Sequence, residues 1–268
     1  MEKIGEGSFS VVFRAFDEVT KEMVAVKVDK AGPTKRKMAA AEALKLQDLQ
    51  ESEYVPKVHA SGWTPGCGYY VMELLGPSLK RFVSKHVMEH RQLLPMRKAL
   101  ELGISMIRAV ESLHDLEYVH RDLKPDNFAF GMEGSANQDK LYIIDFGLAR
   151  KYIDDNGEFC PEIDQFCGNM RYASVNALLR KGHGRCDDLW SVFFIMLEFA
   201  KGPLPWSTVN RSELAAVKQR SIGPELVSGL PPEFGLIMEH LQTLKYEDLP
   251  DYEYMVQLLQ DCLSKLDE

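Results

Sequence analysis

The sequence predicts an α+β fold with two lobes: a small β-rich lobe with one helix up to about Glu73, and a larger, mainly helical lobe from 74 to 268. Met23–Val28 alternates in the manner of a strand, whereas 95–114 is apolar over much of a helical circumference, which is typical of a buried central helix. With 268 residues, 45% of them hydrophobic, the chain can bury a large core, in one domain of two lobes or in two small domains. We expect a single domain over 1–268.

Composition and charge limit the function classes. A formal net charge of −8 argues against a primary role in nucleic-acid binding, which needs a basic face. The strongest apolar stretch, Val192–Leu197, is far too short to span a bilayer. Five scattered cysteines without metal-ligand spacing favour reduced thiols in an intracellular compartment. We therefore expect a soluble, intracellular monomer with neither nucleic-acid nor membrane partners, located in the cytoplasm and also in the nucleus.

The first element reads as strand, glycine turn, strand over residues 4–12. Glycines let a backbone approach phosphates closely, and their amide hydrogens can face the phosphate oxygens. On the glycines alone, an ordinary hairpin is about equally consistent with this stretch. The candidate nucleotide-binding residues here are Ile4, Gly5, Glu6, Gly7, Ser8 and Val12.

The next strand offers a lysine in a defined setting. Alternation over Met23–Val28 places Ala25 and Lys27 on one face, so that the small Ala25 can pack over an adenine while Lys27 reaches its phosphates. A helical stretch from about 37 to 50 offers Glu42 as the carboxylate that fixes the Lys27 ammonium. Taken singly, a lysine on a strand is usually only solvated, and Glu42 is an ordinary surface glutamate.

A third strand, Tyr69–Met72, ends at a glycine and a proline, which give a connector between lobes. Backbone groups of Glu73 and Leu75 are candidates to pair with an adenine edge, and Met72 is expected at the back of that pocket. A plain strand end is the alternative.

The stretch 120–127 carries the chemistry. Asp122 can accept a hydroxyl proton, Lys124 can neutralise a migrating phosphoryl group, and the amide of Asn127 can hold a metal ion. Asp145 follows the apolar run 141–144, so a buried strand would deliver its carboxylate to a loop where magnesium can sit on ATP phosphates. Short strings arise by chance, but two of them in this order, separated by a strand, indicate phosphoryl transfer.

These motifs resemble those of eukaryotic protein kinases, from Gly5 to about Leu259. The segments Glu73–Leu79 and Arg171–Asn176 are similar to the casein kinase 1 group, and 187–191, 197–200 and 204–206 look most like its tau-tubulin kinase branch. The resemblance implies a bilobal kinase fold that uses ATP and Mg²⁺ to phosphorylate Ser/Thr of proteins. It implies the following roles: Asp122 as catalytic base, Lys124 as phosphate-neutralising lysine, Lys27 with Glu42 as ion pair, Asn127 and Asp145 as Mg²⁺ ligands, and Asp188 as cap of the catalytic-loop backbone.

Three sites depart from the general kinase pattern, and one of them, Ser174–Asn176 in place of Ala-Pro-Glu, is a departure shared with the casein kinase 1 group. Ser10 stands in place of the third loop glycine, and Asn169 replaces a threonine that in similar kinases bonds near the catalytic aspartate, which puts rate or hydroxyl choice in doubt. They support one rival reading, a nucleotide-binding pseudokinase scaffold. A small-molecule phosphotransferase of similar fold is a second rival.

Arg171, with Lys218 as its partner, resembles the basic pair that lets this group favour acidic or already phosphorylated substrates. A structural arginine that ties down its own loop is an equally open reading. Beyond Trp206, helices are expected near 212–220, 233–244 and 252–266.

The segment between Gly147 and Ala173 contains no serine or threonine, so activation by Ser/Thr phosphorylation within it is impossible. We expect constitutive activity, with a fixed carboxylate or no partner near Arg121, where regulated kinases place a phosphate. The acidic candidates are Asp154, Asp155, Glu158, Glu162 and Asp164. The sequence leaves open whether Tyr152 or Tyr172 is modified.

Overall fold

The computed structural model describes residues 1–7, 9–30, 38–64, 67–161 and 165–266. The chain forms two compact units, the first made of Met1–Pro77 and Ala129–Ala149 and the second of Ser78–Phe128 and Arg150–Glu268. The predicted α+β fold class is confirmed: strands dominate the first unit and helices the second. The sequence predicted two consecutive lobes that meet near Glu73. In the structure the first unit also contains residues 129–149, so the chain passes between the units more than once.

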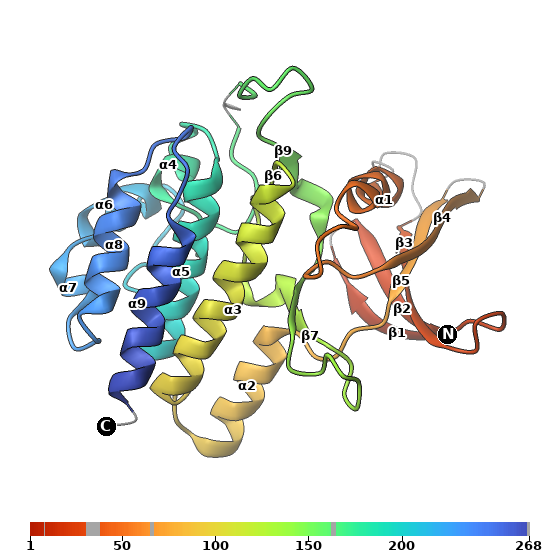
Figure 1. Ribbon diagram of the computed structural model, residues 1–268, viewed down its shortest axis with the longest axis horizontal. Helices are drawn as coiled ribbons and strands as arrows, with labels where there is room; N and C mark the ends of the chain where they lie inside the picture. The colour runs from red at the N-terminus through yellow and green to blue at the C-terminus, as the bar shows by residue number, and fades with distance from the viewer. Residues whose placement is uncertain (8, 31–37, 65–66, 162–164, 267–268) are drawn as a thin grey trace. The chain divides into compact units, whose positions relative to one another are not determined.

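The first unit is built on a five-stranded antiparallel sheet in the order β1-β2-β3-β5-β4 (Figure 1). Val12 pairs with Lys27 across β2 and β3, and Ala25 pairs with Met72 across β3 and β5. Because directly paired residues point to the same side, all four lie on one face. Helix α1 packs against β3, β4 and β5. The elements are β1 (Glu2–Glu6), β2 (Ser10–Phe16), β3 (Met23–Asp29), α1 (Met38–Asp48), β4 (Val58–Thr64) and β5 (Cys67–Glu73).

The later part of the first unit is a short hairpin-like pair, β7 (Phe128–Phe130) with β8 (Leu141–Ile143), followed by the 3₁₀ turn η2 (Phe146–Leu148). The amide of Ile143 donates to the carbonyl of Tyr54 (2.8 Å). This bond connects β8 to the loop between α1 and β4. Phe146 is fully buried, and η2 packs against α1. Asp145 is therefore placed between β8 and the turn that rests on α1.

In the second unit, α3 packs against both α5 and α9 (Figure 1). The predicted buried helix near 95–114 is confirmed as α3, and the apolar run at 192–197 lies in α5, which is buried almost all round. The elements are α2 (Leu79–His90), α3 (Met96–Asp115), β6 (Tyr118–Val119), η1 (Pro125–Asn127), β9 (Arg150–Lys151), α4 (Val175–Leu178), α5 (Arg185–Lys201), α6 (Leu214–Ser221), α7 (Pro224–Val227), α8 (Glu233–Thr243) and α9 (Tyr252–Lys265).

Local capping fixes where these helices begin. Ser78 and Ser174 accept hydrogen bonds from backbone amides three residues ahead, and Asp251 does the same at the start of α9. At the start of α5, Asp187 accepts the amide hydrogen of Gly184 (2.7 Å). Over the described part of the chain, none of the helices has the length and apolar character that a membrane crossing requires.

Candidate active site

The first unit gathers three of the predicted site residues around one ammonium. Lys27 Nζ lies 2.7 Å from Glu42 Oε2 and 2.9 Å from Asp145 Oδ1, and the lysine side chain is only 9% exposed. Burial disfavours the ammonium, but the two carboxylates outweigh it and raise the pKa of Lys27. The lysine is therefore charged, and the predicted pair with Glu42 is present. Asp145 joins that pair as a third member.

Glu42 is bonded to more than the lysine. Its Oε1 accepts hydrogen bonds from the hydroxyl of Tyr70 (3.0 Å) and from the backbone amide of Phe146 (3.0 Å). The carboxylate thus connects α1 to β3, β5 and η2 in one buried network. Sequence reasoning missed Tyr70, although its position, two residues before Met72 on the same strand face, was a usable signal.

The predicted nucleotide-binding residues of the first unit lie along the same sheet. The stretch 4–7 ends β1 and enters a tight turn, in which the amide of Gly7 donates to the carbonyl of Ser10 (2.9 Å). Ser8 lies outside the described residues. Val12, Ala25 and Met72 share the face of Lys27, as the strand register requires. Past β5, Leu75 precedes Gly76, whose amide donates to the carbonyl of Phe130 (2.9 Å).

The second unit holds the predicted catalytic carboxylate. Lys124 Nζ donates to Asp122 Oδ2 (2.6 Å), and Asn127 Nδ2 donates to the carbonyl of Asp122 (2.8 Å) and to its Oδ2 (3.2 Å). Asp122 Oδ1 is buried and has no hydrogen-bond partner among the residues that the structure describes. One carboxylate oxygen is thus fixed by two neighbours, while the other is left to accept a proton.

Asp188 holds the backbone on which Asp122 sits. Arg121 has a left-handed backbone conformation (φ 70°), which costs energy in a non-glycine residue. Asp188 Oδ2 accepts the amide of His120 (2.6 Å), and Oδ1 accepts that of Arg121 (2.9 Å). The predicted capping role of Asp188 is confirmed, and these two bonds offset the cost of the strained turn.

Two histidines complete the surroundings of Asp188. Burial by itself favours the neutral acid, but hydrogen bonds from His114 and His183 keep the pKa of Asp188 below its usual range. Burial lowers the pKa of His114, which is therefore neutral and donates from Nε2 to Asp188 while its Nδ1 accepts the Tyr252 hydroxyl (2.7 Å). Sequence reasoning missed His114, because nothing in the α3 pattern distinguishes it from an ordinary buried position.

Gly168 lies against the catalytic loop. Its φ is +94°, and a β-carbon built there would collide with the carbonyl oxygen of Arg121 and approach Asp122 Oδ1 to 3.3 Å. Only glycine therefore fits this position. It was also missed, although a glycine directly before the departure at Asn169 was a signal for a close backbone approach.

The protein kinase domain family matches residues 1–267. The chain belongs to the protein kinase family. It is 40% identical over 269 residues to a probable serine/threonine-protein kinase of Dictyostelium discoideum, covering 99% of this chain and 53% of the relative. It is 30% identical over 276 residues to casein kinase I homolog 3 of Schizosaccharomyces pombe, covering 99% of this chain and 62% of the relative. The chain thus spans between half and two thirds of the length of these relatives.

These matches confirm the predicted resemblance to protein kinases. They also confirm that the chain is similar to a member of the casein kinase 1 group. The assignment to the tau-tubulin kinase branch stays a prediction. The two halves of the kinase site are each assembled within their own unit, Lys27 with Asp145 in the first and Asp122 with Asn127 in the second. That both converge on one nucleotide stays a prediction as well.

The oxygen atoms predicted to hold magnesium in this kinase domain suit that ion. Asp145 has a side chain that is 48% exposed, so its carboxylate can take a hydrated cation. Asn127 uses only its Nδ2 in the bonds to Asp122, and its amide oxygen takes no part in them. In kinase sites Mg²⁺ binds a small number of protein oxygen ligands, and water molecules and phosphate oxygens complete its coordination.

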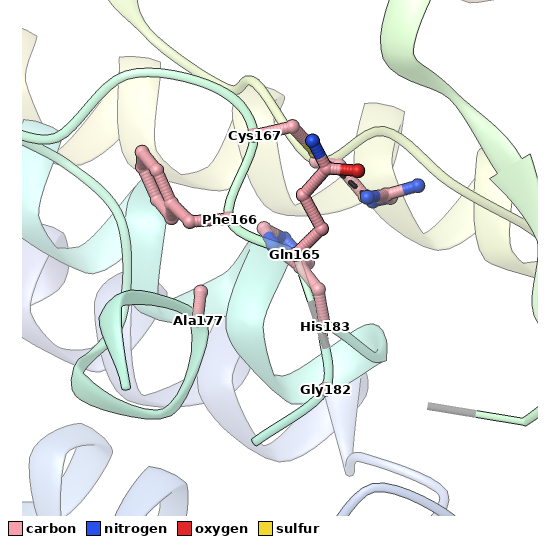
Figure 2. A pocket seen from close by; sticks show the side chains of 7 residues that line it. Gln165, Phe166, Cys167, Ala177, Gly182 and His183 are labelled. Atoms are coloured by element: carbon pink, nitrogen blue, oxygen red, sulfur yellow. Dashed lines mark hydrogen bonds between the residues drawn. The ribbon is translucent and has the colours of Figure 1, made fainter. Parts of the chain in front are cut away.

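Arg121 of the kinase domain has a described neighbour of an unexpected kind. Its Nη2 lies 2.8 Å from the sulfur of Cys167, where a carboxylate or no partner was expected. Burial raises the pKa of Cys167 even though the guanidinium opposes this, so the neighbour is a neutral thiol. Glu162 and Asp164 lie outside the described residues. Beside Arg121 is a cavity of about 10 Å³, room for one water; Figure 2 shows the residues around it, Gln165, Phe166, Cys167, Ala177, Gly182 and His183.

The two residues predicted to form a substrate anion site, Arg171 and Lys218, have different surroundings in the structure. Arg171 is 44% exposed and pairs with Glu198 (3.1 Å), as expected for an arginine that ties down its own loop. Lys218 has no exposed surface, and its ammonium donates to three backbone carbonyls. The prediction that Lys218 binds a substrate anion is therefore wrong, because its buried ammonium already donates to three backbone carbonyls and has no N–H group left for an anion. Arg171 remains the candidate.

Substituting Gly168 by alanine should impair both folding and catalysis. The left-handed φ alone costs about 1–2 kcal/mol in a residue with a β-carbon, and the collision with Arg121 would displace the loop that carries Asp122. The matched control is Gly157→Ala, which has a φ of +81° but open space around it, and should show the strain without the loss of activity. Thermal unfolding and phosphoryl-transfer rates measure the two effects. Equal activity in the two variants would contradict the inference.

Substituting Asp188 by asparagine should destabilise the second unit by about 2–5 kcal/mol, because an amide NH₂ would face backbone amides that need an acceptor. Since the folded pKa of Asp188 is lowered, the stability that its charge contributes is present above the ordinary value of 3.8 and is lost as the pH falls below it. The difference between wild type and variant should therefore shrink at acid pH in chemical denaturation. A constant difference from pH 7 to 3 would contradict the assignment.

The control for Asp188→Asn is Asp154→Asn. Asp154 also accepts two backbone amides, those of Asn156 and Glu158, but it lies in an exposed loop. The Asp154→Asn substitution should leave the activity unchanged.

Proposed function

We propose that this chain is a serine/threonine protein kinase domain that transfers the γ-phosphoryl group of ATP to hydroxyls of protein substrates. The observation that carries the proposal is the asymmetry of the Asp122 carboxylate. Lys124 and Asn127 fix Oδ2, while Oδ1 is buried and has no partner among the described residues. A carboxylate oriented in this way is suited to accept the proton of one positioned hydroxyl.

The transfer is an in-line displacement. A bond forms between the substrate oxygen and the γ-phosphorus while the bond from phosphorus to the leaving ADP oxygen breaks. Asp122 Oδ1 takes the hydroxyl proton, and the ammonium of Lys124, held 2.6 Å from Oδ2, offsets negative charge on the migrating group. Positioning and charge stabilisation supply most of the rate in such a reaction.

The first unit supplies the nucleotide half of the proposal. Lys27 is charged and held between two carboxylates, which suits it to bind ATP phosphates, and Ala25 and Met72 line the same sheet face for the adenine. The β1–β2 turn and the backbone of Glu73 and Leu75 complete the contacts. Mg²⁺, held by Asn127 and Asp145, would neutralise charge on the phosphates.

The relatives support the serine/threonine class, since one carries the name of a probable serine/threonine-protein kinase and another that of a casein kinase I homolog. We propose casein kinase 1-type activity toward acidic or already phosphorylated sites, with Arg171 as the anion contact. The net charge of −8 supports protein rather than nucleic-acid partners. A monomeric, intracellular protein with constitutive activity belongs to the same proposal.

One assay tests the reaction. Protein made in cells without other kinases is supplied with labelled ATP and Mg²⁺, casein as an acidic protein acceptor and glycerol as a small alcohol. Label on casein, lost in Asp122→Asn, is the expected result. Label on glycerol alone would indicate a small-molecule phosphotransferase. Calorimetric binding of ATP without transfer to either acceptor would indicate a pseudokinase scaffold, and activity that appears only after prior phosphorylation would contradict constitutive activity.

A further inference from the structure

The ammonium of Lys218 is enclosed and fully hydrogen-bonded. The residue lies on α6, has 0% exposed surface, and donates to the carbonyls of Met170 (3.0 Å), Arg171 (2.7 Å) and Ala173 (2.6 Å). An ammonium has three N–H groups, and here each has one acceptor. All three acceptors belong to one short stretch of backbone, which we name the 170–173 segment.

Aromatic rings close the remaining sides. Lys218 Nζ lies 4.9 Å from the ring centroids of both Phe194 and Trp206. Burial lowers the pKa of Lys218 to about 6. However, a neutral amine has only two N–H groups and would leave one carbonyl without a donor, and aromatic faces attract a cation. The surroundings therefore favour the charged form, against the effect of burial.

Other contacts hold the same segment. The indole Nε1 of Trp206 donates to the carbonyl of Arg171 (2.8 Å), the atom that Lys218 also contacts. Glu198 binds the guanidinium of Arg171 and the hydroxyl of Tyr172. The 170–173 segment is thus fixed from α5, α6 and the Trp206 turn, and Lys218 is the group that contacts most of its carbonyls.

The segment adjoins the reacting carboxylate. It follows Gly168, where a β-carbon would come within 3.3 Å of Asp122 Oδ1, and Asn169, whose side chain accepts the amide of Arg171 (2.9 Å). A hydroxyl that reaches Oδ1 comes close to Gly168, and the 170–173 segment begins two residues further along the chain. The position of the 170–173 backbone therefore bears on where a protein substrate can lie.

We propose that Lys218 is a positioning residue for the protein substrate: it acts through the backbone of the 170–173 segment and does not touch the substrate. A buried ammonium costs desolvation energy that an apolar residue of similar volume would not, so a role in stability alone does not account for it. The inference rests on the proposed kinase function. It assigns Lys218 a role different from the anion contact suggested by its charge.

The test compares Lys218→Met with Lys201→Met. Lys201 also donates to two backbone carbonyls, those of Glu225 (3.2 Å) and Leu226 (3.1 Å), but away from the 170–173 segment. Lys218→Met should raise KM for casein about tenfold or more, in line with the loss of charge-assisted hydrogen bonds, while KM for ATP stays within about twofold. Lys201→Met should change neither. Amide hydrogen exchange should rise at 170–173 only in the Lys218 variant.

Trp206→Phe is a milder second variant, which removes one donor to the Arg171 carbonyl and keeps a ring, in case Lys218→Met does not fold. It should raise KM for casein by a smaller factor, with KM for ATP unchanged. If wild type transfers no label to casein, the proposed function fails. If wild type is active but the folded Lys218 or Trp206 variants keep the wild-type KM for casein, or raise both KM values equally, the positioning role is excluded while the proposed function stands.

Discussion

Replacing Asp122 by asparagine is expected to lower kcat about a hundredfold to ten-thousandfold, the range in which a general base contributes. The amide preserves the size of the side chain but cannot take a proton at the position of Oδ1. Lys124 and Asn127 would still find an acceptor at the other position, so the loop should keep its conformation. Initial rates of phosphoryl transfer to casein, with ATP affinity from calorimetry, measure the effect.

Asp126→Asn is the control for this substitution. Asp126 belongs to the same loop, but it is 44% exposed and forms a surface pair with Lys80 (3.0 Å). Surface pairs contribute little, and this variant should keep its rate within about twofold of wild type. A kcat for Asp122→Asn within tenfold of wild type would rule out the assignment of Asp122 as the base.

Replacing Lys27 by methionine is expected to abolish measurable transfer and to weaken binding of ATP with Mg²⁺. The substitution removes the cation shared by Glu42 and Asp145, and Glu42 is only 2% exposed. An uncompensated buried carboxylate costs about 3–5 kcal/mol, so the unfolding temperature should fall as well. Calorimetry with ATP and thermal unfolding measure the two losses. Lys140→Met, which removes a surface pair with Glu53, is the control for loss of a lysine in the first unit.

A double variant separates stability from chemistry. Adding Glu42→Gln to Lys27→Met removes the buried charge, and it should recover part of the unfolding temperature without recovering activity, because no cation faces the phosphates. Recovery of both together would mean that Lys27 serves only the fold.

Residues whose role follows from local spacing could be predicted from the sequence. The strand period places Ala25 and Lys27 on one face, and the pairing register bears this out. The carboxylate at 188, at the start of an apolar run, was rightly read as buried, and it caps the loop at His120 and Arg121. In such cases the side-chain type and its place on an element already specify the contact.

Contacts that depend on the packing of distant segments could not be predicted. A lysine on a short helix looks solvated, and only the packing of Phe194 and Trp206 around Lys218 makes it buried. Cys167 was only one of five scattered thiols until the fold placed it beside Arg121. The helix α2 escaped sequence analysis because its mixed apolar and charged pattern is weak, although Ser78 caps it clearly.

The first unit is made of two separate stretches of sequence, 1–77 and 129–149, and this has a consequence for folding during synthesis on the ribosome. The carbonyls of Tyr54 and Pro77 receive their backbone partners only when Ile143 and Phe130 have been made. A nascent chain that has reached residue 77 therefore lacks β8, Asp145 and the turn that packs on α1. The first unit cannot be completed in order of translation, because its last residues, 129–149, are made after residues 78–128 of the second unit.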